Sequence, residues 1–155
     1  MGSKHALVLV VEVVCGFAVL TAAPADAQSV RDACTLVTQA QVTSAVGARV
    51  DIGQPIGKTG CQWSTDPKAK TGHMMITLSI WDENKWFSKK STPGIPMKPV
   101  SGIGDDAYFA TLGDLTSLFV KKGKSTLDIR VYGLHDTAKQ EEIERSVAKD
   151  ALARW

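Results

Sequence analysis

Apolar and polar residues alternate along several short segments of this chain, and such alternation indicates β-strands with one buried face. The clearest segment is HMMITLSIW, residues 73–81, in which Met74, Ile76, Leu78 and Ile80 share one face. Later in the chain, DAYFATL, TSLFVKK and TLDIRVY follow one another with glycine turns between them. Short strands joined by tight turns pair in antiparallel fashion, so we expect a meander here.

Two weaker strand signals lie upstream. The segment 48–60 reads as a short strand broken by glycines and a proline, and CQWST, residues 61–65, is expected to be extended. Side chains two residues apart in a strand share a face, so Cys61 and Trp63 should be buried side by side.

The first predicted helix covers residues 39–46. Thr38 and Gln41 form a capping box, an apolar stripe follows, and Gly47 ends the helix. We expect this helix to cover the face of the sheet that carries Cys61.

Two further helices follow the strands. Asp82 is placed to cap a short helix over 83–90, and the last helix should run from Asp136 or Thr137 to the C-terminus. The apolar stripe of the last helix consists of Ile143, Val147, Ala148, Ala151, Leu152 and Trp155.

The segment STPGIPMKPVSGIG, residues 91–104, contains three prolines and three glycines, and we predict a surface loop. The order of elements then favours the α+β class, with an antiparallel sheet of about five to six strands flanked by two to three helices. A single domain is expected over residues 28–155.

The first 27 residues have the pattern of a secretory signal peptide, with an apolar run and an A-x-A site that ends at Ala27. We expect the mature chain to begin at Gln28 and to be periplasmic or secreted. Two valines precede Cys15 where a lipoprotein signal needs small residues, so no stable membrane anchor is predicted. The full chain carries 18 Lys and Arg against 16 Asp and Glu, which is too balanced for a nucleic-acid-binding polycation.

Cleavage would leave Cys34 and Cys61 in an oxidising compartment, where two cysteines allow one disulfide. Closing a loop of this length stabilises a fold by about 3.5 kcal/mol in the chain-entropy model. The alternative, a reactive Cys61 or a thiolate metal ligand, requires a His or Cys at motif spacing, and the sequence has none.

Candidate chemistry is sparse. The mature chain has two histidines, His73 and His135, and an enzyme would have to combine one of them with Asp105 or Asp106. Neither histidine lies in a known catalytic motif. We therefore predict no catalytic residue, no metal site and no cofactor, and keep a hydrolase or metal-dependent enzyme as an alternative.

Aromatic and basic residues gather around the short helix at 83–90. Trp81, Trp86, Lys89 and Lys90 are the candidate binding surface, since such surfaces suit anionic or amphiphilic partners. The competing interpretation is a solvated face whose lysines protect a sheet edge.

Four stretches, ACTLVTQAQVTSAVG, GCQW, VSGIGDDAYF and the C-terminal helix, resemble small exported bacterial proteins and lipoproteins with a PsbP-like fold. The resemblance implies structural roles for Cys34, Cys61, Trp63 and the turn glycines, and it supplies no catalytic residue. Our leading hypothesis is a monomeric, non-enzymatic binding or accessory protein of the bacterial envelope. Its partner would be an envelope component, a protein or an amphiphile. An inhibitor of a secreted hydrolase, presenting the proline-rich loop, is a further alternative.

Overall fold

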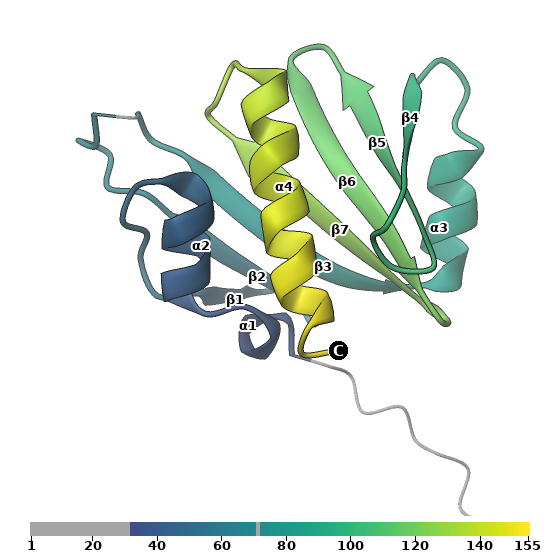
Figure 1. Cartoon of the computed structure of the whole chain (residues 1–155), viewed down its shortest axis with the longest axis horizontal. Helices are drawn as coiled ribbons and strands as arrows, with labels where there is room; N and C mark the ends of the chain where they lie inside the picture. The colour runs from purple at the N-terminus through teal and green to yellow at the C-terminus, as the bar shows by residue number, and fades with distance from the viewer. Residues whose placement is uncertain (1–31, 71) are drawn as a thin grey trace, which may run out of the picture.

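The computed structural model describes residues 32–70 and 72–155, and the expected signal peptide lies outside these residues. The described residues form an open antiparallel sheet of seven strands with helices on both faces (Figure 1). The helices are α1 (Ala33–Leu36), α2 (Gln39–Val46), α3 (Glu83–Lys90) and α4 (Thr137–Leu152). The strands are β1 (Gln54–Ile56), β2 (Gly60–Ser64), β3 (Met75–Asp82), β4 (Met97–Val100), β5 (Asp106–Leu112), β6 (Leu115–Lys122) and β7 (Ser125–Tyr132).

The strand order is β1-β2-β3-β7-β6-β5-β4. A short turn joins β1 to β2, a longer segment joins β2 to β3, and α3 then carries the chain to the far edge of the sheet. From there β4 to β7 return as a meander until β7 pairs with β3. The predicted α+β class and the predicted meander are confirmed, with slightly more strands than expected.

The main core lies between the sheet and the helices α1, α2 and α4, and α4 crosses in front of the sheet in Figure 1. Alternate residues of β3, namely Ile76, Leu78 and Ile80, point into this core as the pattern predicted. Val147 and Ala148 of α4 belong to the same core and are fully buried. Burial of this apolar surface is the main force that holds the helices to the sheet.

A smaller core lies on the opposite face, under α3. Trp86 packs there against Tyr108 of β5 with ring centroids 4.9 Å apart, and Tyr108 stacks on Phe119 of β6 at 5.3 Å. These three side chains come from elements that are distant in sequence, and they fasten α3 to the sheet.

The predicted start and end of α2 and the predicted start of α4 are confirmed. Thr38 and Gln41 form the capping box of α2, and Gly47 ends the helix with a φ of 74°. A left-handed φ of this kind favours glycine, because any other residue would bring its Cβ too close to the backbone. Asp136 caps α4 by accepting a hydrogen bond from the Lys139 N–H.

Two segments differ from the prediction. Residues 97–100, which were assigned to a surface loop, form the edge strand β4 on β5, with Pro99 opposite Tyr108. Proline is tolerated at an edge because its missing N–H removes no bond from the rest of the sheet. The four-residue helix α1 was not foreseen, since it is too short to show a helical period.

Candidate functional site

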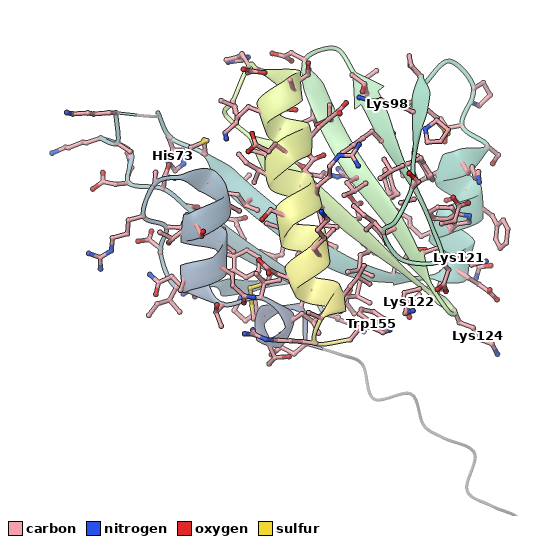
Figure 2. All side chains as sticks on the ribbon, viewed as in Figure 1. His73, Lys98, Lys121, Lys122, Lys124 and Trp155 are labelled. Atoms are coloured by element: carbon pink, nitrogen blue, oxygen red, sulfur yellow. A yellow bond between two sulfur atoms is a disulfide. The ribbon has the colours of Figure 1, made fainter. Side chains whose placement is uncertain are left out.

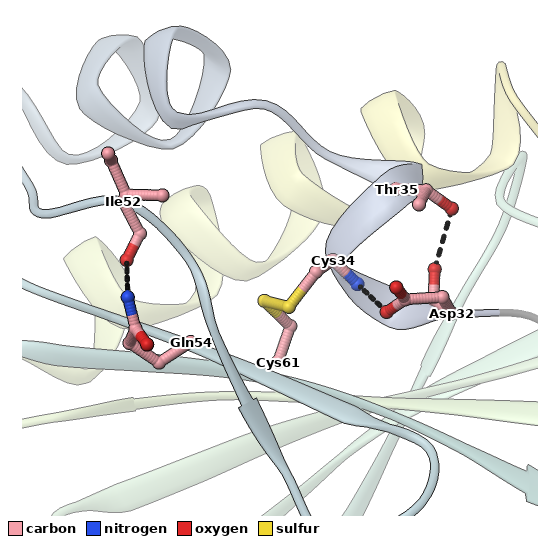
Figure 3. Close-up of a disulfide and its surroundings, with 6 residues drawn as sticks. All are labelled: Asp32, Cys34, Thr35, Ile52, Gln54 and Cys61. Atoms are coloured by element: carbon pink, nitrogen blue, oxygen red, sulfur yellow. Dashed lines mark hydrogen bonds between the residues drawn. A yellow bond between two sulfur atoms is a disulfide. The ribbon is translucent and has the colours of Figure 1, made fainter.

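Cys34 of α1 and Cys61 of β2 form a disulfide with Cα atoms 5.0 Å apart, as predicted (Figure 3). The Asp32 carboxylate caps α1 by accepting a hydrogen bond of 2.9 Å from the Cys34 N–H. Gly53 passes directly over the bridge, because a Cβ at this position would lie 2.8 Å from the Cys61 sulfur and 2.7 Å from the Trp63 indole nitrogen. Cys61 and Trp63 are both buried, so this site is a structural staple between helix and sheet.

The exposed chemistry lies where β3 ends and α3 begins. Trp81 is 41% exposed and Phe87 of α3 is 57% exposed. Between them, Asp82 starts α3 by accepting hydrogen bonds from the N–H groups of Asn84 and Lys85. Successive helical residues are turned by about 100°, so the burial of Trp86 directs the neighbouring Phe87 ring into solvent.

Lysine ammonium groups lie over both exposed rings. The Nζ of Lys85 is 4.4 Å from the centroid of the Trp81 ring, and that of Lys121 is 5.3 Å from the Phe87 ring. Figure 2 shows Lys121, Lys122 and Lys124 together at the end of the β6–β7 hairpin. We name as the aromatic–lysine patch the residues Trp81, Lys85, Phe87, Lys89, Lys121 and Lys124.

Within the described part of the chain, two lysines near the patch form ion pairs with aspartates, and the four lysines of the patch do not. Lys90 pairs with Asp106 at 2.8 Å, and Lys122 pairs with Asp105 at 3.3 Å. The hydrogen bond from the Gly123 N–H, followed by that from Lys122, lowers the pKa of Asp105. The four lysines of the patch form no ion pair with a carboxylate among the described residues.

The predicted binding surface of Trp81, Trp86, Lys89 and Lys90 is therefore wrong in part. Trp86 is 3% exposed and belongs to the smaller core, so it is not a surface residue. Lys90 is occupied by Asp106, whereas Trp81 and Lys89 remain available. Phe87 was missed, because the sequence alone could not decide which of two adjacent aromatics faces the sheet.

The residues of the enzyme alternative lie at opposite ends of the sheet. Asp105 and Asp106 lie at the start of β5, whereas His135 contacts Asp114 just beyond the far end of that strand, with His135 Nδ1 2.5 Å from the Asp114 carboxylate. A strand of this length spans about 20 Å. His73 lies near the His135 end, where its backbone carbonyl approaches Gly133. Neither His73 nor His135 is brought to either aspartate, and the structure gives this combination no shared site.

A shallow depression is present beside His135. Asp114, Tyr132, Leu134 and Gln140 contribute to its lining. The hydrogen bond from His135 lowers the pKa of Asp114. The side chains of His135 and Asp114 are 85% and 66% exposed, so water surrounds the pair and screens its charge.

A buried polar cluster lies between α4 and the sheet, and sequence reasoning missed it. Gln140 and Glu144 are 1% and 0% exposed. The Thr116 hydroxyl lies 2.9 Å from the Gln140 carbonyl oxygen and 3.2 Å from each Glu144 oxygen. Desolvation raises the pKa of Glu144 to about 8, against the opposing effect of the Thr116 hydrogen bond.

The proton positions in this cluster depend on whether Glu144 is ionised. An ionised Glu144 accepts from the Thr116 hydroxyl, and the Gln140 carbonyl still accepts from the Thr116 N–H at 2.8 Å. A hydroxyl has a single proton, so the Thr116 hydroxyl cannot donate to Gln140 and to an ionised Glu144 at once. If Glu144 is protonated, it donates to the Thr116 hydroxyl, and that hydroxyl donates to Gln140. The cluster is enclosed by α4 and the sheet, which makes it part of the core rather than a binding site.

Within the part of the chain that the structure describes, no three His, Cys, Asp or Glu side chains come together to hold a metal ion. No helix of residues 32–70 and 72–155 is long and apolar enough to cross a membrane. The chain matches no protein-family model, no curated protein and no solved structure.

Proposed function

We propose that this chain is an exported, non-enzymatic binding or accessory domain of the bacterial envelope, and that it binds through the aromatic–lysine patch. The observation that carries the proposal is the pair of exposed rings, Trp81 and Phe87, each with a lysine ammonium over it at one end of the sheet. Large exposed aromatics cost solubility and are typical of surfaces that are covered by a partner.

Export is supported by two features. The N-terminal pattern is that of a signal peptide ending at Ala27, and a disulfide between Cys34 and Cys61 is compatible with an oxidising compartment. We also retain the PsbP-like exported family as a proposed relationship, supported by the short motifs around these cysteines. The inhibitor alternative stays a prediction, although β4 now ties the middle of its proposed loop to the sheet.

The test is cosedimentation of the purified chain with envelope fragments from a bacterial host. A Trp81→Ser, Phe87→Ser variant should bind about tenfold more weakly, because it loses on the order of 1 to 2 kcal/mol of apolar contact. The matched control is Ile52→Ser with Leu112→Ser, since these two residues are 70% and 69% exposed and lie outside the patch. The control should bind as the unmodified chain does. Equal binding by all three proteins would contradict the proposed surface.

A further inference from the structure

We propose that the aromatic–lysine patch binds the surface of a membrane that contains anionic phospholipids, peripherally and reversibly. This inference rests on the proposed function and gives its partner a chemical class. Such membrane binding requires apolar side chains that can enter the lipid interface and cations that can contact phosphate groups. It also requires a rigid support that holds both on one surface.

The rigid support is α3. Its inner side is fixed by the stacked rings of Trp86, Tyr108 and Phe119, so Phe87 projects from a helix that cannot retract from the sheet. Trp81 lies at the end of β3, which pairs along its whole length with β7. Both exposed rings are therefore held in fixed positions before any partner arrives, which lowers the entropic cost of binding.

The aromatic side chains suit a lipid interface. Trp and Phe rings are favoured at the boundary between headgroups and acyl chains, where an apolar ring can be partly withdrawn from water. The ammonium groups of Lys85 and Lys121 lie over these two rings, so cations stand next to the apolar side chains. Long lysine side chains can keep their ammonium groups at the level of the phosphates while a neighbouring ring enters the interface. A soluble polyanion offers no apolar layer for Phe87 to enter.

The charges select an anionic surface. Lys85, Lys89, Lys121 and Lys124 form no ion pair with a carboxylate among the described residues, although Lys121 helps to lower the pKa of Asp105. The nearby Asp105 and Asp106 form their ion pairs with Lys122 and Lys90. Asp82 and Glu83 are the remaining acidic residues of this region, and Asp82 is engaged as the cap of α3. Each lysine near an anionic membrane strengthens binding about fivefold. The excess of unpaired cations thus disfavours a zwitterionic membrane.

The experiment measures binding of the purified, disulfide-bonded chain to vesicles. One set contains phosphatidylglycerol and phosphatidylethanolamine in equal amounts, and the other contains phosphatidylcholine alone. We expect binding to the first set only, with a loss of most binding when salt rises from about 0.05 M to about 0.5 M. A Lys85→Gln, Lys121→Gln variant should bind on the order of twentyfold more weakly. Lys68→Gln with Lys70→Gln, which removes the same charge from an exposed loop outside the patch, should change binding less than twofold, on the order of a distant screened charge.

A second arm separates lipid from soluble polyanion. The Trp81→Ser, Phe87→Ser variant should lose binding to the anionic vesicles and keep the same affinity for dextran sulfate as the unmodified chain. Equal binding to both vesicle sets, or binding to dextran sulfate with none to the vesicles, would overturn the inference. If envelope fragments bind through the patch while anionic vesicles do not, the lipid inference fails and the proposed function stands. If the chain binds neither envelope fragments nor anionic vesicles through the patch, both the lipid inference and the proposed function fail.

Discussion

Replacing both cysteines, as Cys34→Ala with Cys61→Ala, is expected to lower the free energy of unfolding by about 3.5 kcal/mol. The bridge closes a loop between residues separated by 27 positions, and its removal restores conformational freedom to the unfolded chain. A loss of this size should reduce the melting temperature by on the order of 10 °C in a domain of this length. Denaturant unfolding followed by tryptophan fluorescence measures it, since Trp63 lies beside the bridge in the core.

Reductant provides the control for this prediction. It should lower the unfolding midpoint of the unmodified chain towards that of the double-alanine variant, and it should leave the variant itself unchanged. If the variant unfolds at the same denaturant concentration as the oxidised chain, the bridge is not the staple that the fold implies.

The second large effect concerns the buried carboxyl of Glu144. Its pKa is raised to about 8 in the folded chain from a usual value of 4.5, chiefly by desolvation. The folded state therefore holds a proton that the unfolded state releases between these two pH values. The stability that depends on this proton is fully present below about pH 4.5 and is lost as pH rises through about 8.

Glu144→Gln keeps the shape of the side chain and removes the ionisation. Its amide can donate to Thr116 at every pH, so the variant should match the unmodified chain at about pH 5 and exceed it by about 4 kcal/mol at about pH 9. Urea unfolding at about pH 5, 7 and 9 measures this difference. Glu142→Gln is the matched control, because the Glu142 side chain is 69% exposed on the same helix. Parallel stability curves for the Glu144 variant and the unmodified chain would refute the assignment.

Much of the fold could be predicted because its signals are local. The capping box at Thr38 and Gln41 and the left-handed Gly47 define α2 without reference to the rest of the chain. The alternation along β3 and β7 is equally local, since one face of each strand is buried in the main core. The bridge followed from having two cysteines outside the predicted signal peptide.

The errors arise where burial depends on topology. Trp86 was placed on the surface because the partners that bury it, Tyr108 and Phe119, meet only once β5 and β6 are brought under α3. Nothing in the local sequence distinguishes its orientation from that of Phe87. Residues 97–100 were read as loop because proline argues against a central strand, and the position of β4 at the sheet edge could not be known.

The buried polar cluster did leave a signal in the sequence. Gln140 and Glu144 continue the spacing of the apolar stripe on α4 that includes Val147 and Ala151, and Thr116 has the same parity on β6 as the buried Leu118. Because these side chains are polar, the apolar stripe predicted for the last helix does not include Gln140 and Glu144. Polar residues that stand at the same helical or strand spacing as buried apolar residues predict a buried hydrogen-bond network.

We propose an exported domain that is stabilised by a disulfide and binds an envelope component. The measurement that tests it most directly is the intact mass of the chain after expression with its own N-terminus in a bacterial host, determined in each cell fraction with and without reductant. We expect a chain that begins at Gln28, is found partly with the envelope, and gains about two mass units on reduction of one disulfide. A cytoplasmic chain that retains Met1 and has free thiols at Cys34 and Cys61 would contradict it.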